Sequence, residues 1–218
     1  MYNFELSKKM QSFSYVILTL GFSVSLAADP SPPVWPNAFS INFTESTLGG
    51  GDTNGSWIYD FANLRQRLDR DTGKFDRFCG SVDNADSPCT HLVRDGIRYL
   101  IWPVLKKCCG CCTDADGCGI VKPTWMIDSQ GKYSGNAPLK TPVWSGNADS
   151  WEITGNQPNY WFTVAGTDTP VGFAQVPIDY QYFIPSSYET DQSFPDSLFT
   201  LPTYCEPKCT GINTCTLV

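Results

Sequence analysis

The sequence predicts a mostly β domain that is exported from the cell and stapled by disulfides. Three observations support this prediction: short runs of alternating apolar and polar residues recur, turn residues separate these runs, and ten cysteines follow an export-like N-terminus. No stretch shows a sustained apolar period of 3.6 residues, which an amphipathic helix would have. The part after residue 28 is long enough for one sizeable core, so we expect a single domain.

Residues 1–27 have the three-part pattern of a secretory signal peptide. Lys8 and Lys9 form a basic start, and residues 15–26 form an uncharged apolar run that is too short to cross a bilayer. Small residues at the −3 and −1 positions predict cleavage before Ala28. We therefore expect a secreted or extracellular protein without a transmembrane segment in its mature part; the alternative is a lysosomal or other endomembrane lumen.

Charge and histidine content exclude several functions. The formal net charge is −7 and no basic stripe is present, so nucleic acid binding is not expected. His91 is the single histidine, which argues against Ser-His-Asp and Cys-His catalysis. The sequence therefore predicts a protein that is not an enzyme.

The predicted elements begin after a proline-rich arm at residues 28–38. Residues 39–44 alternate between apolar and polar side chains, which predicts a strand with one wet face. Asn42 lies on that wet face, and both Asn42 and Asn54 stand in sequons, so both are candidate N-glycosylation sites.

Residues 56–70 alternate as a strand would, although the second half of this run also suits a helix. The turn residues at 71–74 predict a hairpin that returns through Phe75 and Phe78. A second hairpin is predicted over residues 91–102, because Asp95-Gly96 favours a two-residue type I′ turn.

Further strands are expected at residues 144–154, 160–164, 172–176 and 180–184, and mostly loops after residue 186. The β domain is predicted to span residues 39–204, with a cysteine-rich loop at 108–118 and a cysteine-containing tail at 205–218.

All ten cysteines lie after the signal-like segment, and an even count in an exported chain favours disulfides. The spacing at 108–112 superficially suits zinc, and a redox-active pair is a third alternative, but exported thiols are normally oxidised. Adjacent cysteines do not easily bridge each other, so the cluster is expected to tie to distant segments. The cysteines are Cys79, Cys89, Cys108, Cys109, Cys111, Cys112, Cys118, Cys205, Cys209 and Cys215.

Residues 59–67, Tyr-Asp-Phe-Ala-Asn-Leu-Arg-Gln-Arg, resemble the Y-D-x-x-N-x-R-x-R strand of ependymin-related secreted glycoproteins. Short segments at 99–101, 144–146, 183–185 and 199–205 follow in the same order as in that family. The resemblance covers roughly residues 35–205. The chain departs from the family pattern at the 108–112 cysteine cluster and in the tail, and is most similar to a cysteine-rich branch.

The resemblance implies a half barrel of strongly curved antiparallel sheets, related to bacterial lipoprotein carriers, with an apolar pocket in the concave face. Family members are often dimeric and are thought to bind hydrophobic ligands or calcium. Calcium is implied by the resemblance alone: residues 114–117 resemble the start of a calcium loop but lack its closing glutamate, so a turn is predicted there. No cofactor or metal is otherwise expected.

Candidate ligand-binding residues are two arginines and three tryptophans. Arg65 and Arg67 alternate with their neighbours and share one face of a strand, where they would meet an anionic head group if the face is concave, or solvent if it is not. Trp144, Trp151 and Trp161 lie in a region crowded with aromatic residues that would pack in a core or line a cavity.

The leading hypothesis is a secreted binding protein whose apolar pocket takes a lipid-like ligand. The alternative is a structural glycoprotein of the cell surface or matrix that self-associates, with the proline-rich arm pairing with a neighbour's sheet edge. A secreted glycoside hydrolase is a third possibility, for which Glu45 and Glu152 are the candidate carboxylates.

Overall fold

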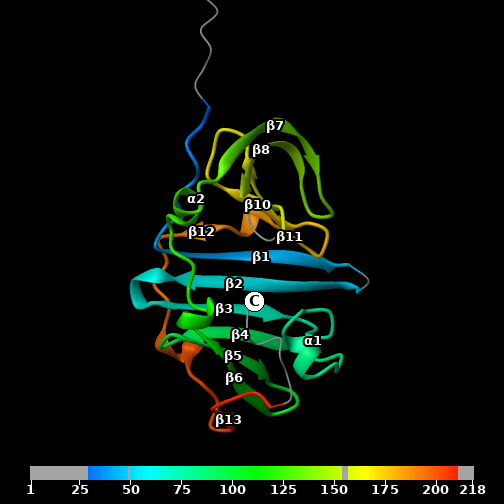
Figure 1. Ribbon diagram of the computed structural model, residues 1–218, viewed down its shortest axis with the longest axis vertical. Helices are drawn as coiled ribbons and strands as arrows, with labels where there is room; N and C mark the ends of the chain where they lie inside the picture. The colour runs from blue at the N-terminus through cyan, green and yellow to red at the C-terminus, as the bar shows by residue number, and fades with distance from the viewer. Residues whose placement is uncertain (1–28, 49, 154–156, 211–218) are drawn as a thin grey trace, which may run out of the picture.

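The computed structural model describes residues 29–48, 50–153 and 157–210, which form one open, curved sheet (Figure 1). The strand order is β13-β6-β5-β4-β3-β2-β1-β11-β10-β9-β8-β7, and β12 pairs with β1. The predicted mostly β, disulfide-stapled fold is confirmed, although one continuous sheet replaces the expected pair of sheets. The signal-like segment and Cys215 lie outside the described residues.

The first seven strands in the chain are β1 (Ala38–Thr47), β2 (Asp52–Asp60), β3 (Arg65–Arg70), β4 (Cys89–Arg94), β5 (Ile97–Trp102), β6 (Lys107–Thr113) and β7 (Lys132–Lys140). They are followed by β8 (Ser145–Ile153), β9 (Asn159–Val164), β10 (Pro170–Gln175), β11 (Asp179–Phe183), β12 (Glu189–Thr190) and β13 (Cys205–Glu206). The helical turns are α1 (Cys79–Val82), α2 (Trp125–Asp128), η1 (Phe61–Asn63), η2 (Asp114–Asp116), η3 (Pro185–Ser187) and η4 (Asp196–Phe199). None of the described helices is long and apolar enough to cross a membrane.

Strand β1 has the alternation that the sequence predicts. Phe39, Ile41 and Phe43 are buried in the concave face, whereas Asn42 is exposed on the opposite, outer face. Side chains alternate between the two faces of a strand. The inward-facing residues of β1 therefore show, through the pairing register, which residues of each neighbouring strand face the concave side.

The hairpin predicted at residues 71–74 is wrong, because the chain already turns at η1, between β2 and β3. Asn63 donates to both carboxylate oxygens of Asp60 at 3.0 and 2.9 Å, and Leu64 takes the left-handed conformation with φ 51°. These local bonds reverse the chain early, so β3 ends at Arg70. Phe75 and Phe78 then lie in the segment leading to α1, not in a strand.

The hairpin predicted over residues 91–102 is confirmed as β4 and β5. Arg94 pairs with Ile97, and Asp95 and Gly96 both have positive φ, 51° and 71°. A type I′ turn needs positive φ at both central positions, which Asp-Gly tolerates well. The later predicted strands are also found, as β8 to β11.

The predicted cysteine-rich loop is also wrong over its first half, where residues 107–113 form β6, paired with β5. The cysteines of β6 are buried and face both sides of the sheet, so the strand lacks an apolar–polar alternation. Residues 114–116 form η2, a turn beside the Cys112–Cys118 disulfide, as predicted. The side chain of Asp116 there accepts hydrogen bonds from the backbone and hydroxyl of Thr113.

Two disulfides join β6 to the C-terminal segment. The prediction that the cysteine cluster bonds to a distant part of the chain is therefore confirmed. Cys108 bonds to Cys205 and Cys109 to Cys209. Cys79 and Cys89 bond to each other. Cys111 is disulfide-bonded as well.

Three arginines on the outer face hold residues 194–199 against β3 and β4. Arg65 donates to the carbonyl of Phe194, Arg67 to that of Leu198 and Arg94 to that of Phe199, at 2.8–3.0 Å. Arg65 also bonds to Asp60 at 2.7 Å. The outer face of this half of the sheet is therefore covered by the chain itself.

Candidate functional site

The concave face is built from rows of side chains that cross the strands. Directly opposed residues in an antiparallel pair share a face. One row contains Glu45, Gln181, Phe173, Trp161 and Trp151, from β1 through β11, β10 and β9 to β8. A second row contains Trp57, Leu68, His91 and Leu100, from β2 to β5.

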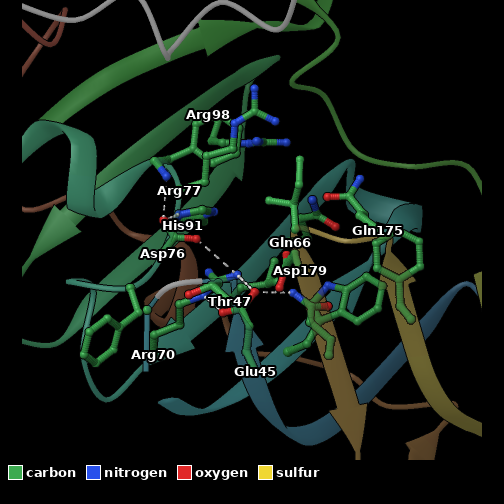
Figure 2. A pocket seen from close by; sticks show the side chains of 18 of the residues that line it. Glu45, Thr47, Gln66, Arg70, Asp76, Arg77, His91, Arg98, Gln175 and Asp179 are labelled. Carbon is green, nitrogen blue, oxygen red and sulfur yellow. Dashed lines mark hydrogen bonds and ion pairs between the residues drawn. The ribbon is translucent and has the colours of Figure 1, made fainter. Parts of the chain in front are cut away.

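Apart from Trp151 and Leu100, the residues of these rows line a pocket of about 700 Å³ (Figure 2). Its aromatic and aliphatic lining includes Trp35, Trp57, Leu68, Phe75, Phe78, Trp125, Trp161, Phe173 and Ile178. The volume falls in the range of sites that take small organic ligands. The pocket is therefore large enough, and apolar enough along much of its wall, to hold a lipid-sized molecule.

Trp35, from the proline-rich arm, is the centre of the aromatic wall. Its ring centroid lies 5.1 Å from those of Trp57 and Trp161 and 5.3 Å from that of Trp125. The backbone N–H of Trp35 donates to the carbonyl of Pro123 at 3.1 Å. In the described part of the chain, the indole N–H groups of these four tryptophans are buried without a hydrogen-bond acceptor.

A buried charge network forms the polar part of the pocket. Arg70 makes two hydrogen bonds to the carboxylate of Glu45, and its Nη2 lies 3.4 Å from Oδ2 of Asp76. Gln181 donates to Oε1 of Glu45 at 2.8 Å. Glu45 is 1% exposed and Arg70 5%, so each charge depends on its partner for the solvation that water would otherwise give.

Asp76 links this network to His91. Burial alone raises the pKa of Asp76, but Arg70 and His91 together hold it well below its usual range. The Nε2 of His91 lies 2.8 Å from Oδ1 of Asp76. Burial lowers the pKa of His91 against the attraction of Asp76, so we expect a neutral imidazole at pH 7.

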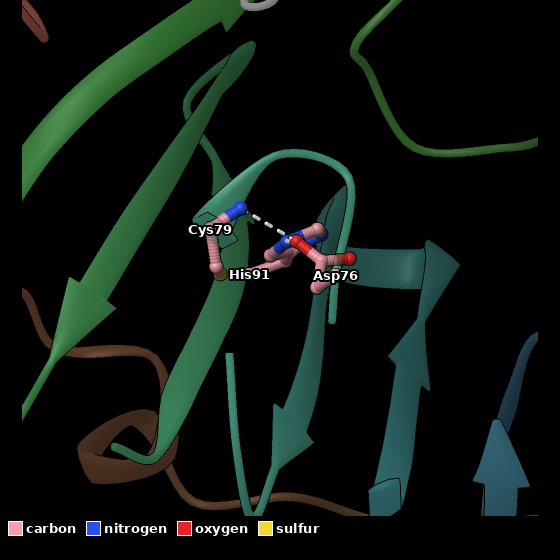
Figure 3. A group of neighbouring side chains, drawn as sticks. All are labelled: Asp76, Cys79 and His91. Carbon is pink, nitrogen blue, oxygen red and sulfur yellow. Dashed lines mark hydrogen bonds and ion pairs between the residues drawn. The ribbon is translucent and has the colours of Figure 1, made fainter. Parts of the chain in front are cut away.

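Asp76, Cys79 and His91 bring three potential metal-ligand atoms within 4.8 Å of one another (Figure 3). The sulfur of Cys79 is bonded to Cys89, so it has no thiolate to offer a metal. The side chain of Asp76 instead accepts the backbone N–H of Cys79 at 2.6 Å and that of Phe78 at 3.0 Å, at the start of α1. The three residues therefore have a structural role: Asp76 joins His91 to the start of α1 by hydrogen bonds.

Asp179 lies in the pocket wall near the carboxylate of Glu45, and its Oδ1 is buried without a hydrogen-bond partner among the described residues. Burial, together with repulsion from Glu45, raises the pKa of Asp179 to about 7, although the charge of Arg70 opposes this shift. Figure 2 shows Asp179, Gln66 and Gln175 on one side of the pocket, and Arg98, His91 and Asp76 on the other.

The raised pKa of Asp179 predicts a pH-dependent stability. The folded protein retains a proton that the unfolded chain releases between about pH 4 and 7, so the unfolding free energy falls as pH rises through this range. The slope is at most about 1.4 kcal/mol per pH unit. We expect Asp179→Asn to remove this decline, so that the variant gains stability relative to the parent between pH 4.5 and 7.5.

Urea unfolding of both proteins at several pH values measures this difference. His91 favours folding more strongly as pH rises, but it is present in both proteins and cancels in the comparison. A stability difference that stays constant with pH would contradict the assignment.

The predicted ligand-binding residues divide between the two faces. Trp161 lines the pocket, and Trp151 is packed beside it in the core without lining it. Trp144 packs against the backbone at Gly146, away from the pocket. Of the two placements left open for Arg65 and Arg67, the structure has the outer face, because β3 directs Gln66, Leu68 and Arg70 inward; their candidacy as ligand-binding residues of the pocket is therefore wrong. The sequence pattern indicated this orientation, because the apolar Leu68 marks the inward face of the strand and shares that face with Arg70.

The two candidate carboxylates of a hydrolase also lie on opposite faces. Glu45 is buried in the pocket and held by Arg70, while Glu152 follows the inward-facing Trp151 and points outward beside Tyr160. Asp179 lies closer to Glu45, but the carboxylate of Glu45 is already bonded by Arg70 and Gln181. The third possibility, a hydrolase that pairs Glu45 with Glu152, is therefore contradicted.

The two sequons lie side by side on the outer face. Asn42 pairs with Ser56 and Thr44 with Asn54, and the hydroxyl of Thr44 donates to Oδ1 of Asn54 at 3.0 Å. Both asparagines are exposed and face away from the pocket. Their glycosylation stays a prediction.

No protein-family model and no curated protein sequence matches this chain. Among solved structures, an uncharacterized conserved protein from Thermus thermophilus is similar over 79% of this chain and 91% of its own, with a TM-score of 0.51 and 6% sequence identity. The structure of the Pseudomonas aeruginosa MucA/MucB complex matches with a TM-score of 0.39 and 12% identity, over 77% of this chain and 56% of that chain. A LolA superfamily protein from Nitrosomonas europaea matches with a TM-score of 0.38 and 9% identity, over 78% and 92% of the two chains. The chain therefore shares the fold of the Thermus protein.

Proposed function

We propose that this chain is an exported, non-enzymatic binding protein whose concave pocket holds an apolar, lipid-like ligand. The observation that carries the proposal is the pocket of about 700 Å³, walled by four tryptophans and by phenylalanine and aliphatic side chains. Aromatic surface of this extent favours an apolar molecule that covers it.

The signal-like N-terminus and the disulfides support an oxidising compartment, either outside the cell or in an endomembrane lumen. The relationship to ependymin-related proteins stays a prediction, and a curved antiparallel sheet with a concave pocket is what that resemblance implies.

The arrangement of charged groups favours binding over catalysis. His91 is buried and bonded to Asp76, and Glu45 is neutralised by Arg70. These contacts keep both groups in fixed partnerships, whereas a general acid or base must reach a reacting group.

The structural alternative relied on a free N-terminal arm. Pro33 and Trp35 of this arm are buried, and Trp35 packs into the aromatic wall of its own domain. Because the arm packs against its own domain, it supports the pocket proposal and not the pairing of the arm with the sheet edge of a neighbouring molecule.

Binding of the uncharged fluorescent probe N-phenyl-1-naphthylamine tests this function. We expect saturable binding with enhanced probe fluorescence, and we expect Gln175→Trp, which adds volume at the pocket wall, to weaken it by about tenfold or more. Ser46→Trp is the matched control, because Ser46 lies on the outer face of β1. Absence of saturable binding, or equal binding by both variants, would refute the proposal.

A further inference from the structure

We propose that the pocket's ligand carries a small anionic group, a carboxylate or a phosphate, at one end of its apolar body, and that Arg98 binds this group. The inference rests on the proposed function and adds the chemistry of the ligand's polar end.

The charge of the pocket differs in sign from that of the chain. The whole chain has a formal net charge of −7, yet the pocket is lined by more cationic than acidic side chains. The cationic ones are Arg70, Lys74, Arg77 and Arg98, and the acidic ones are Glu45, Asp76 and Asp179. A surplus of cationic lining residues, backed by apolar walls, favours ligands that carry a negative charge.

Arg98 is the inner cation without a carboxylate bound to it. Within residues 29–48, 50–153 and 157–210, its guanidinium makes no hydrogen bond or salt bridge, and its contact is with the ring of Phe78, 4.9 Å from the centroid. Burial lowers the pKa of Arg98 to about 10, which leaves the side chain charged at neutral pH. A half-buried, charged group with free N–H donors gains most from an anionic acceptor.

The register places Arg98 on the ligand side of the sheet. It pairs with Val93, which in turn pairs with Gln66, so Arg98 and Gln66 share a row on the concave face. Figure 2 shows Arg98 on the side of the pocket opposite Gln66 and Gln175. The guanidinium is thus available to a molecule lying in the pocket.

Arg70 supplies a second donor. Its Nε and Nη2 are bonded to Glu45, but its Nη1 is buried without an acceptor among the described residues, on a side chain that is 5% exposed. A buried donor without a partner destabilises the protein, so an acceptor on the ligand would relieve that cost. The guanidinium donors of Arg98 and Arg70 therefore favour a hydrogen-bond acceptor at the polar end of the ligand.

A series of ligands with one tail and different head groups tests the inference. Palmitate, hexadecyl phosphate, hexadecanol and hexadecyltrimethylammonium would each compete with the uncharged probe, below their micelle-forming concentrations. We expect the two anions to compete best. Arg98→Met should weaken the anions by about tenfold to a hundredfold and leave hexadecanol unchanged, while Arg98→Lys should restore part of the loss.

Arg94→Met is the matched control: it removes the same charge from the same hairpin, but Arg94 lies on the outer face beside Phe199. Equal competition by palmitate and hexadecanol, or tightest binding of the ammonium compound, would overturn the inference while leaving the proposed function intact. Failure of the probe itself to bind would refute the proposed function. If Arg98→Met does not fold, the ligand series on the unmodified protein decides alone.

Discussion

Replacement of Arg70 by methionine is expected to lower the unfolding free energy by about 3–5 kcal/mol. The change leaves Glu45 and Asp76 buried without the guanidinium that neutralises both, and an uncompensated buried charge costs about that much. Urea unfolding monitored by tryptophan fluorescence measures the difference.

Arg67→Met is the matched control for this change. Arg67 is only three residues away on the same strand, but its partner Asp69 is 34% exposed, so the same substitution, which also removes the hydrogen bond to Leu198, should cost only about 1–2 kcal/mol. Adding Glu45→Gln to Arg70→Met should recover part of the loss, because one of the two unpaired carboxylates is then neutral. Equal effects of the two single changes would contradict the burial of the network.

Removal of the Cys109–Cys209 disulfide by alanine at both positions is expected to cost about 2 kcal/mol. The bond joins residues 100 apart, but the adjacent Cys108–Cys205 bond already closes that long loop, so the extra loop that Cys109–Cys209 closes in the unfolded chain is only about six residues long. Thermal unfolding under non-reducing conditions measures the effect.

The Cys112–Cys118 bond gives the comparison, because it joins residues only 6 apart. Replacing that pair should cost about 2 kcal/mol by the same chain-entropy argument. If removing Cys109–Cys209 cost much more than removing Cys112–Cys118, the adjacent Cys108–Cys205 bond would not join the same two segments as described.

The strands whose two faces differ in polarity could be predicted from the sequence. Phe39, Ile41 and Phe43 alternate with polar residues because one face of β1 is buried and the other is wet. The Asp95-Gly96 turn was equally readable, because few residue pairs accept positive φ at both positions.

Strands β6 and β7 were missed for two different physical reasons. β6 is rich in cysteines that are buried on both faces, so it has no alternation. β7 is an edge strand that is mostly exposed and contains Gly135 and Pro138, both of which normally indicate a loop. In each strand the pairing is set by a neighbour and not by the strand's own pattern.

The pocket depends on contacts between segments far apart in the sequence. Trp35 comes from the arm, Trp125 from α2 and Trp161 from β9, and their convergence follows from the sheet's topology. Strand parity would have separated Arg65 and Arg67 from the inward-facing Arg70. The pairing of Glu45 with Arg70 across β2, in contrast, had no local signal.

Binding of an apolar ligand in the concave pocket can be followed through the seven tryptophans of the chain. In ¹⁵N-labelled protein titrated with palmitate, the indole N–H signals of the four pocket tryptophans, Trp35, Trp57, Trp125 and Trp161, are expected to shift. Those of Trp102, buried among the cysteines, and of Trp144 should stay in place. Shifts confined to Trp102 and Trp144, or no saturable shift of the pocket tryptophans, would contradict the account.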